Sequence, residues 1–521
     1  MYRKLEERLQ TLSKNKVENL LQGGLKGIEK ESLRVTSKGH ISQTAHPESL
    51  GSTLTHPHIT TDYSEALLEL ITPPFSDIKD TLSFLTDLHH FIYTNIDEEL
   101  LWATSMPCLL TSDESIPIAE YGSSNVGRMK HIYRHGLSHR YGRAMQAIAG
   151  VHYNYSIPEH FWPVFQQLEK DESKLEDFIS ASYMGMIRNF QRVGWIVSYL
   201  FGASPSVCSS FIKLRLKEFE AFDCSSCSEL YATSLRMSDI GYKNSNQDGI
   251  VVSYNSLDEY VASLREAIKT PNVDYEKMGV VVDGEYRQLN TNILQIENEY
   301  YSFVRPKQIA ESGETPSHAL DSRGIKYVEI RAIDVSPFDP IGVNEQQLNF
   351  MEALLIFCLL QESPAMEANE REEFERNQSI TACSGRNAEL KLSRDGENVL
   401  LHDWVKEILN NMHDVCAMLD GEVGHDYTSA LQAQLAKVSN NDLLPSAQVS
   451  TDMDTSGKSF FDFAMEKSRE HKQYFSDLAA PQIRFEQLDE MAKQSINEQH
   501  SLEAIEQLPF DQYLTDYLKL K

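Results

Sequence analysis

Residues 27–35 have the sequence Gly-Ile-Glu-Lys-Glu-Ser-Leu-Arg-Val, which places two acids among apolar side chains. In a strand, residues two apart point to the same side, so Glu29 and Glu31 share a face with Leu33. If that face lies against the core, the two acids are unfavourable unless a cation compensates them. A divalent metal ion commonly binds two carboxylates at once. A solvated edge strand or a helix end with mixed charges is the alternative.

Two further segments carry a polar ligand on a strand pattern. Residues 66–72 form a nearly continuous apolar run in which Glu69 is the only charge. The length of this run favours a buried strand over a helix. Residues 150–156 alternate strictly, with His152 and Asn154 on one face and tyrosine and valine side chains on the other.

A fourth segment, residues 326–333, alternates in the same way and places Glu329 and Arg331 on one face. Four strands that each offer oxygen or nitrogen ligands indicate one sheet whose polar face forms a site. Carboxylates with a single imidazole suit Mg²⁺ or Mn²⁺ better than zinc. Several such ions in a carboxylate cage commonly act on phosphate groups.

The rest of the chain is predominantly helical in its pattern. We predict helices over residues 1–22, 78–98, 128–148, 160–202 and 346–362, and a hairpin at residues 280–286 that continues towards Asn298. Residues 366–521 are mostly helical and acidic, and no Pro/Gly/Ser-rich linker precedes them. We therefore expect this part to pack on the core and not to form an independent domain.

Length and composition restrict the classes of function. The 521 residues are 41% apolar and 24% charged, which is typical of a soluble globular protein with a large core. A formal charge of −29 argues against nucleic acid and against an anionic membrane surface as partners. The N-terminal region has no signal-peptide pattern, and the longest apolar run, residues 353–360, is too short to span a bilayer. These features predict a cytoplasmic protein.

The seven cysteines are too few and too scattered for a disulfide framework, so reduced thiols are expected. Cys224 and Cys227 form a lone CxxC motif without a second pair, and we assign it no role. Glycine motifs near Gly122 and Gly457 lack the full phosphate-binding pattern, and no GxSxG or HExxH motif occurs.

Several segments together resemble those of glutamate-cysteine ligase of the single-domain bacterial type. They include GIEKESLRV, LTHPHITTDYSEALLELITP, YGSSNVGRMKHIYRHGL, GVHYNYS, YATSLRMSDIGY, LNTNILQIENEYY, RPK and YVEIRAIDVSPFDPIGV, in the order of that family. The resemblance covers roughly residues 20–365 and is faint beyond them. It implies an α+β fold of the glutamine-synthetase-like carboxylate-amine ligase type, in which helices surround an antiparallel sheet funnel. One catalytic domain would then comprise residues 1–521, with a core at residues 20–365 and a helical elaboration at residues 366–521.

The resemblance also implies a reaction. ATP phosphorylates the γ-carboxylate of L-glutamate, and the amine of L-cysteine attacks the acyl phosphate to give γ-glutamylcysteine, ADP and phosphate. Several Mg²⁺ or Mn²⁺ ions would serve as cofactors of a monomer that binds small molecules only.

Site residues follow from the resemblance, position by position. The implied metal ligands are Glu29, Glu31, Asp62, Glu69, His152 and Glu329. The implied catalytic residues are Glu29, Arg134, Arg236, Glu329 and Arg331, whose arginines would meet substrate carboxylate or phosphoryl oxygens. The implied cysteine pocket consists of Tyr63, Tyr133, Gln146, Tyr242 and Tyr301.

Two other functions stay open at this point. One is an ATP-dependent glutamate-amine ligase of the same fold with a different amine acceptor. The other is a metal-binding regulatory protein that keeps the cage without turnover.

Overall fold

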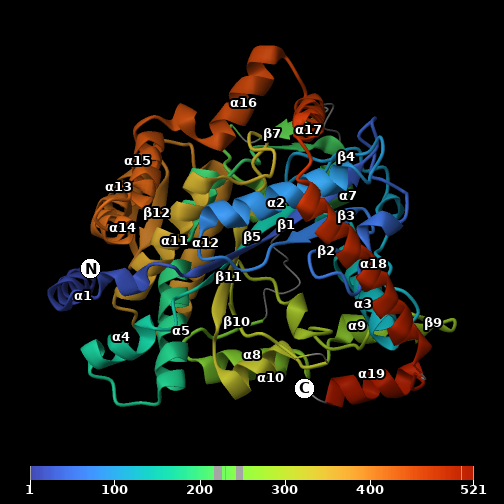
Figure 1. The fold of residues 1–521 in the computed structure, drawn as a ribbon, viewed down its shortest axis with the longest axis horizontal. Coiled ribbons are helices and arrows are strands. Elements are labelled where there is room, and N and C mark those ends of the chain that lie inside the picture. Colours follow the sequence, from blue (N-terminus) through green and yellow to red (C-terminus); the bar gives the residue numbers. More distant parts are fainter. Residues whose placement is uncertain are drawn as a thin grey trace.

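The structure is a computed structural model that describes residues 2–215, 226–228, 230–241, 250–311, 313–505 and 507–519. An antiparallel sheet lies at its centre (Figure 1). The strands of this sheet are β1 (Leu25–Val35), β2 (Ile59–Thr61), β3 (Leu67–Ile71), β4 (Leu100–Leu101), β5 (Gly150–Ser156), β10 (Val304–Lys307) and β11 (Tyr327–Asp334). Their order is β10-β11-β5-β1-β3-β2, and β4 pairs with the end of β1. The α+β class and the four strands predicted from alternation are confirmed.

Three short hairpins lie outside this sheet. They pair β6 (Ser206–Cys208) with β7 (Ser226–Ser228), β8 (Val281–Val282) with β9 (Glu285–Tyr286), and β12 (Lys391–Arg394) with β13 (Glu397–Leu400). The turn between β8 and β9 is Asp283-Gly284, where both residues have positive φ, as a tight hairpin turn requires. This hairpin ends at Tyr286, so the expectation that it continues towards Asn298 is wrong.

Helices make up most of the remaining structure. In the first half they are α1 (Arg3–Asn15), α2 (Ile78–Tyr93), α3 (Asn125–Tyr141), α4 (Phe161–Glu169), α5 (Leu175–Val193), α6 (Trp195–Phe201), α7 (Ser209–Arg215), α8 (Leu257–Ala267) and α9 (Val273–Met278). In the second half they are α10 (Pro316–Arg323), α11 (Glu345–Leu360), α12 (Ala368–Ser384), α13 (Leu401–Asn411), α14 (His413–Asp420), α15 (Asp426–Ser439), α16 (Pro445–Ser456), α17 (Phe460–Asp477), α18 (Gln482–Ala504) and α19 (Phe510–Lys519).

Most of the predicted helices differ in extent from those observed: α1 and α2 end at Asn15 and Tyr93, before the expected residues 22 and 98. The single helical stretch expected over residues 160–202 is divided into α4, α5 and α6, because Lys170 ends α4 in the left-handed conformation. The helix expected over residues 128–148 ends at Tyr141, where Gly142 follows with φ of 76°.

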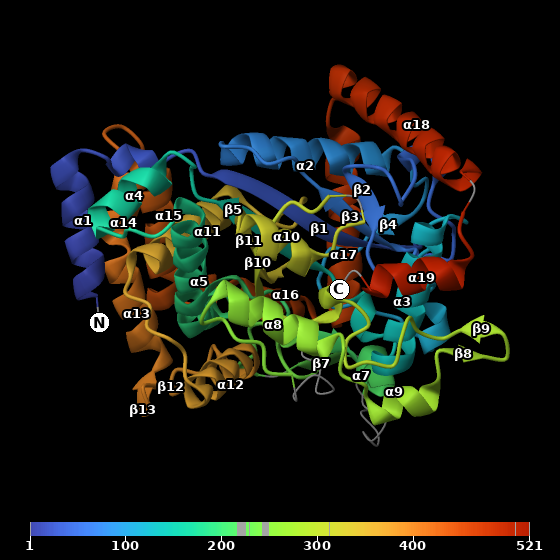
Figure 2. The ribbon, with the colours of Figure 1, turned by 90° about the horizontal axis from the view of Figure 1, so that it is seen from below.

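One face of the sheet is covered by α11 and α2, which also contact each other (Figure 2). Helix α11 is buried along almost its whole length, which explains its apolar sequence. On this face Lys26 of β1 lies 3.0 Å from Glu352 of α11, and both side chains are almost fully buried. Glu352 also accepts a hydrogen bond from the hydroxyl of Tyr155. The opposite face of the sheet carries the acids.

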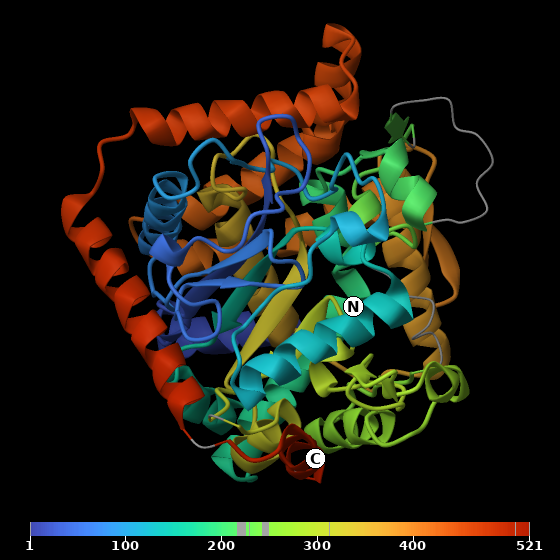
Figure 3. The ribbon, with the colours of Figure 1, turned by 90° about the vertical axis from the view of Figure 1, so that its right-hand side faces the viewer.

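The C-terminal third packs on the same core as the sheet. One hydrophobic cluster extends from Leu5 to Leu488 and includes Phe460 of α17. Helix α18 runs along one side of the molecule, where it is red in Figure 3, and the hydroxyl of its Ser495 accepts a hydrogen bond from Ser52 N–H. The helical character expected for residues 366–521 is confirmed except for the β12–β13 hairpin.

The expectation of reduced thiols is wrong for one pair of cysteines. Cys108 and Cys208 form a disulfide, with Cα atoms 5.4 Å apart. They are separated by 100 residues, and only the folding of β6 against the segment after β4 brings them together. Cys224 lies outside the described residues, and of Cys227 only the backbone is described. Among the helices that the structure describes, none is long and apolar enough to cross a membrane.

Candidate functional site

Strand register places the predicted acids beside one another on one face of the sheet. Glu31 of β1 lies opposite Glu69 of β3, and Glu29 of β1 lies opposite His152 of β5. Glu329 of β11 lies opposite Asn154 of β5. Because directly paired residues in antiparallel strands point to the same face, these side chains form a continuous row, here called the acid row: Glu329, His152, Glu29, Glu31 and Glu69.

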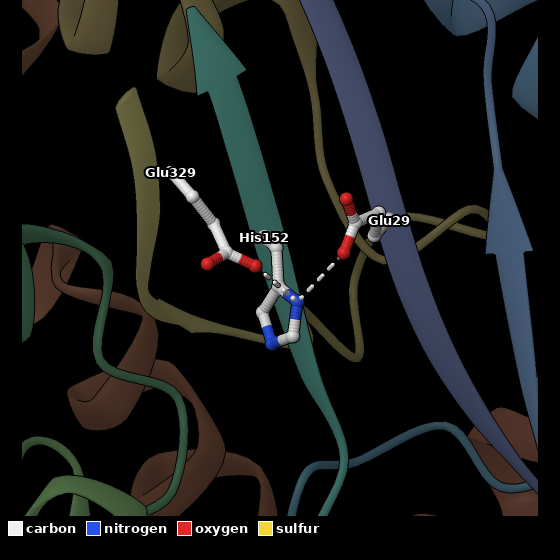
Figure 4. A group of neighbouring side chains, drawn as sticks. All are labelled: Glu29, His152 and Glu329. Carbon is white, nitrogen blue, oxygen red and sulfur yellow. Dashed lines mark hydrogen bonds and ion pairs between the residues drawn. The ribbon is translucent and has the colours of Figure 1, made fainter. Parts of the chain in front are cut away.

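Three members of the acid row form a compact group at its centre. Ligand atoms of Glu29, His152 and Glu329 all lie within 4.8 Å of one another (Figure 4). His152 Nδ1 lies 3.3 Å from Glu29 Oε2 and 3.6 Å from Glu329 Oε1. Its Nε2 lies 3.6 Å from Glu31 Oε1. Both ring nitrogens of His152 therefore face carboxylates.

Neighbouring groups hold the acids in place. The Asn154 amide donates a 2.8 Å hydrogen bond to Glu29, and the Gly150 N–H donates a 2.6 Å bond to Glu31. A Cβ atom at Gly150 would lie 2.0 Å from Nη2 of Arg236, so a larger residue at this strand position would displace the Arg236 guanidinium. The acids are thus oriented before any ligand binds.

Burial and charge divide the acid row into two parts. Burial opposes ionisation of Glu329, but Lys307 and Arg331 hold its pKa well below the usual range. Burial also opposes ionisation of Glu29, but the hydrogen bond with His152 and the charge of Lys307 together lower its pKa.

At the Glu69 end of the row, burial outweighs the effect of nearby positive charge. Burial raises the pKa of Glu69 well above the usual range, and the nearby carboxylates of Glu29, Asp62 and Glu31 add to this effect. Burial, together with Asp62, also raises the pKa of Glu31, although His152 lowers it. The Glu69 end is therefore short of positive charge.

A lack of positive charge beside buried carboxylates favours the binding of a metal cation. Buried polar atoms normally have hydrogen-bond partners, yet Nε2 of His152 has none among the described residues. The carboxylate of Glu31 lies 3.6 Å from this nitrogen, and Glu31 faces Glu69 across β1 and β3. The donor set of carboxylates with one imidazole fits Mg²⁺ or Mn²⁺.

A pocket opens beside the Glu31 end of the acid row, between β1, α3 and residues 298–301. Its wall includes most of the residues predicted for the cysteine pocket and four predicted metal or catalytic residues: Tyr63, Tyr133, Gln146, Tyr301, Glu31, Asp62, Arg134 and Arg331. The Gln146 amide donates a 2.7 Å hydrogen bond to the Tyr301 hydroxyl. Tyr242 lies outside the described residues. We call this pocket the tyrosine pocket.

The three predicted arginines occupy different positions. Arg331 Nη1 donates a 2.9 Å hydrogen bond to Glu329 and lies 3.3 Å from His152 Nδ1, so it borders the acid row. Arg134 Nε donates to the carbonyl of Asp62, and its guanidinium lies 4.6 Å from the Tyr121 ring centre.

Arg236 differs from the other two arginines. It is 1% exposed, and its Nη2 donates a 2.8 Å hydrogen bond to the carbonyl of Arg331. Within the described part of the chain it is not among the residues that line the tyrosine pocket. Its position suits support of β11 and Gly150 better than direct contact with a substrate.

Sequence reasoning missed two cations and one amide at the site. Lys307 Nζ lies 3.1 Å from Glu329 Oε2, and Arg305 lies opposite Glu329 in the sheet. Both belong to the Arg-Pro-Lys segment, whose two cations around a proline were the available signal. Asn154 was placed on the polar face of its strand without a role, and it binds Glu29.

A second pocket lies on the same sheet face, on the other side of the acid row along the strands. Leu25 and Ser156 continue the faces of Glu29 and His152, and both line this pocket. Trp162 and Tyr183 give it aromatic walls, and Lys326 adds a cation. The acid row thus separates two pockets on one sheet face.

Comparisons with known proteins agree with this arrangement. A family model for glutamate-cysteine ligase matches residues 9–381. The chain is 47% identical to a glutamate-cysteine ligase of Alcanivorax borkumensis, over 98% of this chain and 99% of that one. It is 48% identical to the enzyme of Pseudomonas aeruginosa, over 96% and 94% of the two chains.

Two solved structures are also similar to the chain. A glutamate-cysteine ligase of Francisella tularensis in complex with AMP superposes with a TM-score of 0.89, at 36% identity, over 96% of this chain and 98% of that one. A bifunctional glutathione synthetase from Pasteurella multocida has a TM-score of 0.70 at 23% identity, over 92% of this chain and 57% of that one, and shows the shared fold alone.

Proposed function

Because the chain belongs to the glutamate-cysteine ligase family, we propose that the acid row and its two pockets form the active site of its ATP-dependent ligase reaction. The chain joins the γ-carboxylate of L-glutamate to the amine of L-cysteine with consumption of ATP. The expected α+β ligase fold is confirmed by the Francisella enzyme. The observation that carries the proposed location of the site is the row of acids between the two pockets.

The acid row supplies the ligands for Mg²⁺ in this proposal. Glu29, Glu31, Glu69, His152 and Glu329 would hold the ions, and Asp62 stands beside them at the pocket wall. Bound divalent ions neutralise charge on a transferring phosphoryl group and orient it. The choice of Mg²⁺ over Mn²⁺ rests on the hard oxygen donors and stays a prediction.

Arg331 is the residue that we assign to the phosphoryl oxygens. Its guanidinium lies beside Glu329 and His152 and also lines the tyrosine pocket, so it faces both the acid row and the acceptor side. A fixed cation at that point stabilises charge that develops during transfer. Arg134, on the same pocket wall, is suited to a substrate carboxylate.

The tyrosine pocket is suited to cysteine. Its aromatic walls accept a small CH₂-SH group, and polarisable sulfur packs well against ring edges. The amine of cysteine would then lie beside the acid row, where the acyl phosphate of glutamate forms. Selectivity in such a pocket comes from shape and is limited to about 1 to 3 kcal/mol per methyl-sized group.

The second pocket is our candidate for the adenosine part of ATP. The similar Francisella enzyme binds AMP, and a nucleotide whose phosphates reach the acid row must extend along the sheet away from the tyrosine pocket. The pocket wall combines Trp162 and Tyr183 with the cation Lys326. We expect a Ser156→Trp variant to raise the KM for ATP and to leave the KM for cysteine unchanged. An unchanged KM for ATP would place the nucleotide elsewhere.

Three broader expectations stay predictions. They are a single catalytic domain over residues 1–521, a monomer, and a cytoplasmic location. The continuous hydrophobic cluster from Leu5 to Leu488 supports the first.

The acceptor is tested by ADP release from ATP and glutamate with different amino acids. A strong preference for cysteine supports the proposal. Equal rates with bulky amines would favour a ligase with another acceptor, and absence of ADP release with every amine would favour a metal-binding protein without turnover. A Tyr301→Phe variant, which keeps the acid row, separates a failed acceptor assignment from a failed metal assignment.

A further inference from the structure

Two histidines lie one helical turn apart on α3, outside the acid row. His131 and His135 are separated by four residues, a spacing that places side chains on the same face of a helix. Their Nε2 atoms are 3.0 Å apart, and both side chains are half-buried. Neither belongs to the tyrosine pocket or to the acid row. The pair is therefore a feature separate from the acid row and the tyrosine pocket.

The surroundings of His131 fix which of its nitrogens is available. Its Nδ1 lies 2.8 Å from the carbonyl of Ala119, which can only accept a hydrogen bond, so Nδ1 carries the proton. The carboxylate of Glu120 lies 3.5 Å from the same nitrogen. Metal-binding histidines commonly donate their second ring nitrogen to a carbonyl or carboxylate in this way. The lone pair of His131 Nε2 consequently points towards His135.

His135 is neutral near pH 7. Burial and the neighbouring His131 lower its pKa to about 4. In the metal-free protein the proton on His135 Nε2 occupies the 3.0 Å contact. A move of this proton to Nδ1 of the same ring exposes a second lone pair without loss of a proton to solvent.

The distance between the nitrogens suits one bound ion. Zinc binds histidine nitrogen at about 2.0–2.1 Å, so two nitrogens 3.0 Å apart subtend an angle of about 94° at the ion. Such an angle fits tetrahedral or square-planar coordination with small distortion. The hard ion Mg²⁺ prefers oxygen, whereas Zn²⁺, Ni²⁺ and Cu²⁺ bind imidazole well.

We propose that His131 and His135 form a chelating site for a transition-metal ion of the Zn²⁺, Ni²⁺ or Cu²⁺ class, distinct from the Mg²⁺ ligands of the acid row. Water fills the remaining coordination positions, so binding is weaker than at a closed site with four protein ligands. Tyr133 and Arg134 lie on the same helical turn and line the tyrosine pocket. An ion at this site would stabilise that turn of α3.

Three charged or titratable groups surround the pair. The Glu120 carboxylate favours a bound cation. Arg143 disfavours one, but its guanidinium donates hydrogen bonds to the Ser138 hydroxyl and the Ile116 carbonyl, 3.0 Å away in each case. His139, one turn further along α3, is exposed and also disfavours a second positive charge when protonated.

The first test is calorimetric titration of the full-length protein with Ni²⁺ in excess MgCl₂, which keeps the acid row occupied. We expect one class of Ni²⁺ sites that weakens at least tenfold in H131Q and in H135Q. The matched control is H318Q, because His318 is an exposed histidine on α10 without a histidine one turn away. Unchanged Ni²⁺ binding in both α3 variants would overturn the proposal, and so would equal loss in the control.

A second measurement needs no variant. Electron paramagnetic resonance of Cu²⁺ bound to the protein in excess MgCl₂ should show coupling to two imidazole nitrogens. The acid row contains a single imidazole, His152, so it can supply only one. Coupling to one nitrogen would refute the chelate even if the variants failed to fold. With Mg²⁺ alone, H131Q and H135Q should retain ligase activity, so a failure of the metal site is distinct from a failure of the ligase assignment.

Discussion

The two faces of β1 carry charges of opposite sign, and the charged side chains on the two faces have different partners. On the face towards α11, Lys26 has Glu352 as a partner at 3.0 Å, and Arg34 has Glu99 at 2.9 Å. The third cation of this face, Lys30, donates to the Ser32 hydroxyl, and burial lowers its pKa to about 7. Two of the three cations on this face are thus paired with carboxylates within the protein.

The opposite face of β1 gathers like charges instead. Glu31 faces Glu69 across the strand pair, whereas Lys307 and Arg331 pair with Glu329 at the other end of the row. Buried charges that have a partner of opposite sign within the protein belong to the structure. Buried charges without such a partner require a ligand. The comparison therefore separates structural charges from functional ones on a single strand.

The largest expected effect is that of Glu29→Gln. The amide keeps the shape of the carboxyl and removes the charge that faces His152, so we expect kcat to fall by about 10³-fold or more, or about 4 kcal/mol. The free energy of unfolding without metal should fall, because the lowered pKa of Glu29 means that the folded state stabilises the ionised carboxylate. Steady-state kinetics and urea denaturation measure the two effects.

The control is Glu470→Gln, which removes a carboxylate from an exposed pair with Lys467 on α17. It should change neither kcat nor stability by a measurable amount. Near-normal turnover of Glu29→Gln at ordinary Mg²⁺ would refute the metal assignment.

A substitution on the face of β1 towards α11 should lower stability and leave kcat unchanged. Lys26→Met leaves the carboxylate of Glu352 buried without its cation, so we expect the free energy of unfolding to fall by about 3 kcal/mol. Burial already raises the pKa of Glu352, which lets it take up a proton and places the loss at the low end of the usual range. The kcat of the folded fraction should be unchanged.

Lys493→Met removes a lysine from an exposed pair on α18 and is the matched control, expected to cost less than about 0.5 kcal/mol. If Lys26→Met instead lowered kcat at constant stability, the division between the two faces would be wrong.

The contrast between the faces also explains how much the sequence could predict. Glu29, His152 and Glu329 lie on strands of seven or more residues, where alternation identifies the face of each side chain. Lys307 lies on a four-residue edge strand interrupted by Pro306, which is too short for such a pattern. Arg236 sits in a short 3₁₀ turn without periodicity, so its burial beneath β11 could not be inferred.

Contacts between segments that are distant in the sequence could not be predicted from the alternation of apolar and polar residues. The Cys108–Cys208 disulfide joins the loop after β4 to the end of β6, 100 residues further along the chain. The β12–β13 hairpin has its turn at Asp395-Gly396, a turn signal that the helical composition around it obscured.

A third prediction concerns pH and the metal-free protein. The pKa of Glu69 is raised well above the usual range, so the folded state binds a proton that the unfolded state releases above about pH 4.3. Stability therefore falls as pH rises through this window. Glu69→Gln removes that titration, and we expect it to raise the free energy of unfolding by about 1 to 2 kcal/mol at pH 8, with no gain at pH 4.

Thermal unfolding in EDTA between pH 4 and pH 8 tests whether stability falls as pH rises. Added Mg²⁺ should reverse it for the unmodified protein, because metal binding requires the deprotonated carboxylate. A pH profile of Glu69→Gln identical to that of the unmodified protein would show that Glu69 ionises normally.

The smallest expected effect is in the tyrosine pocket, on the acceptor side of the acid row. Tyr301→Phe removes the hydroxyl that accepts a 2.7 Å hydrogen bond from Gln146 and keeps the aromatic wall. A neutral hydrogen bond contributes about 1 kcal/mol, so we expect the KM for cysteine to rise about fivefold. The KM for ATP should not change, because the second pocket lies on the other side of the acid row. Tyr286→Phe, which removes a hydroxyl bonded to Asp511 outside both pockets, is the control. If Tyr301→Phe raised the KM for ATP and left that for cysteine unchanged, the assignment of the two pockets would have to be exchanged.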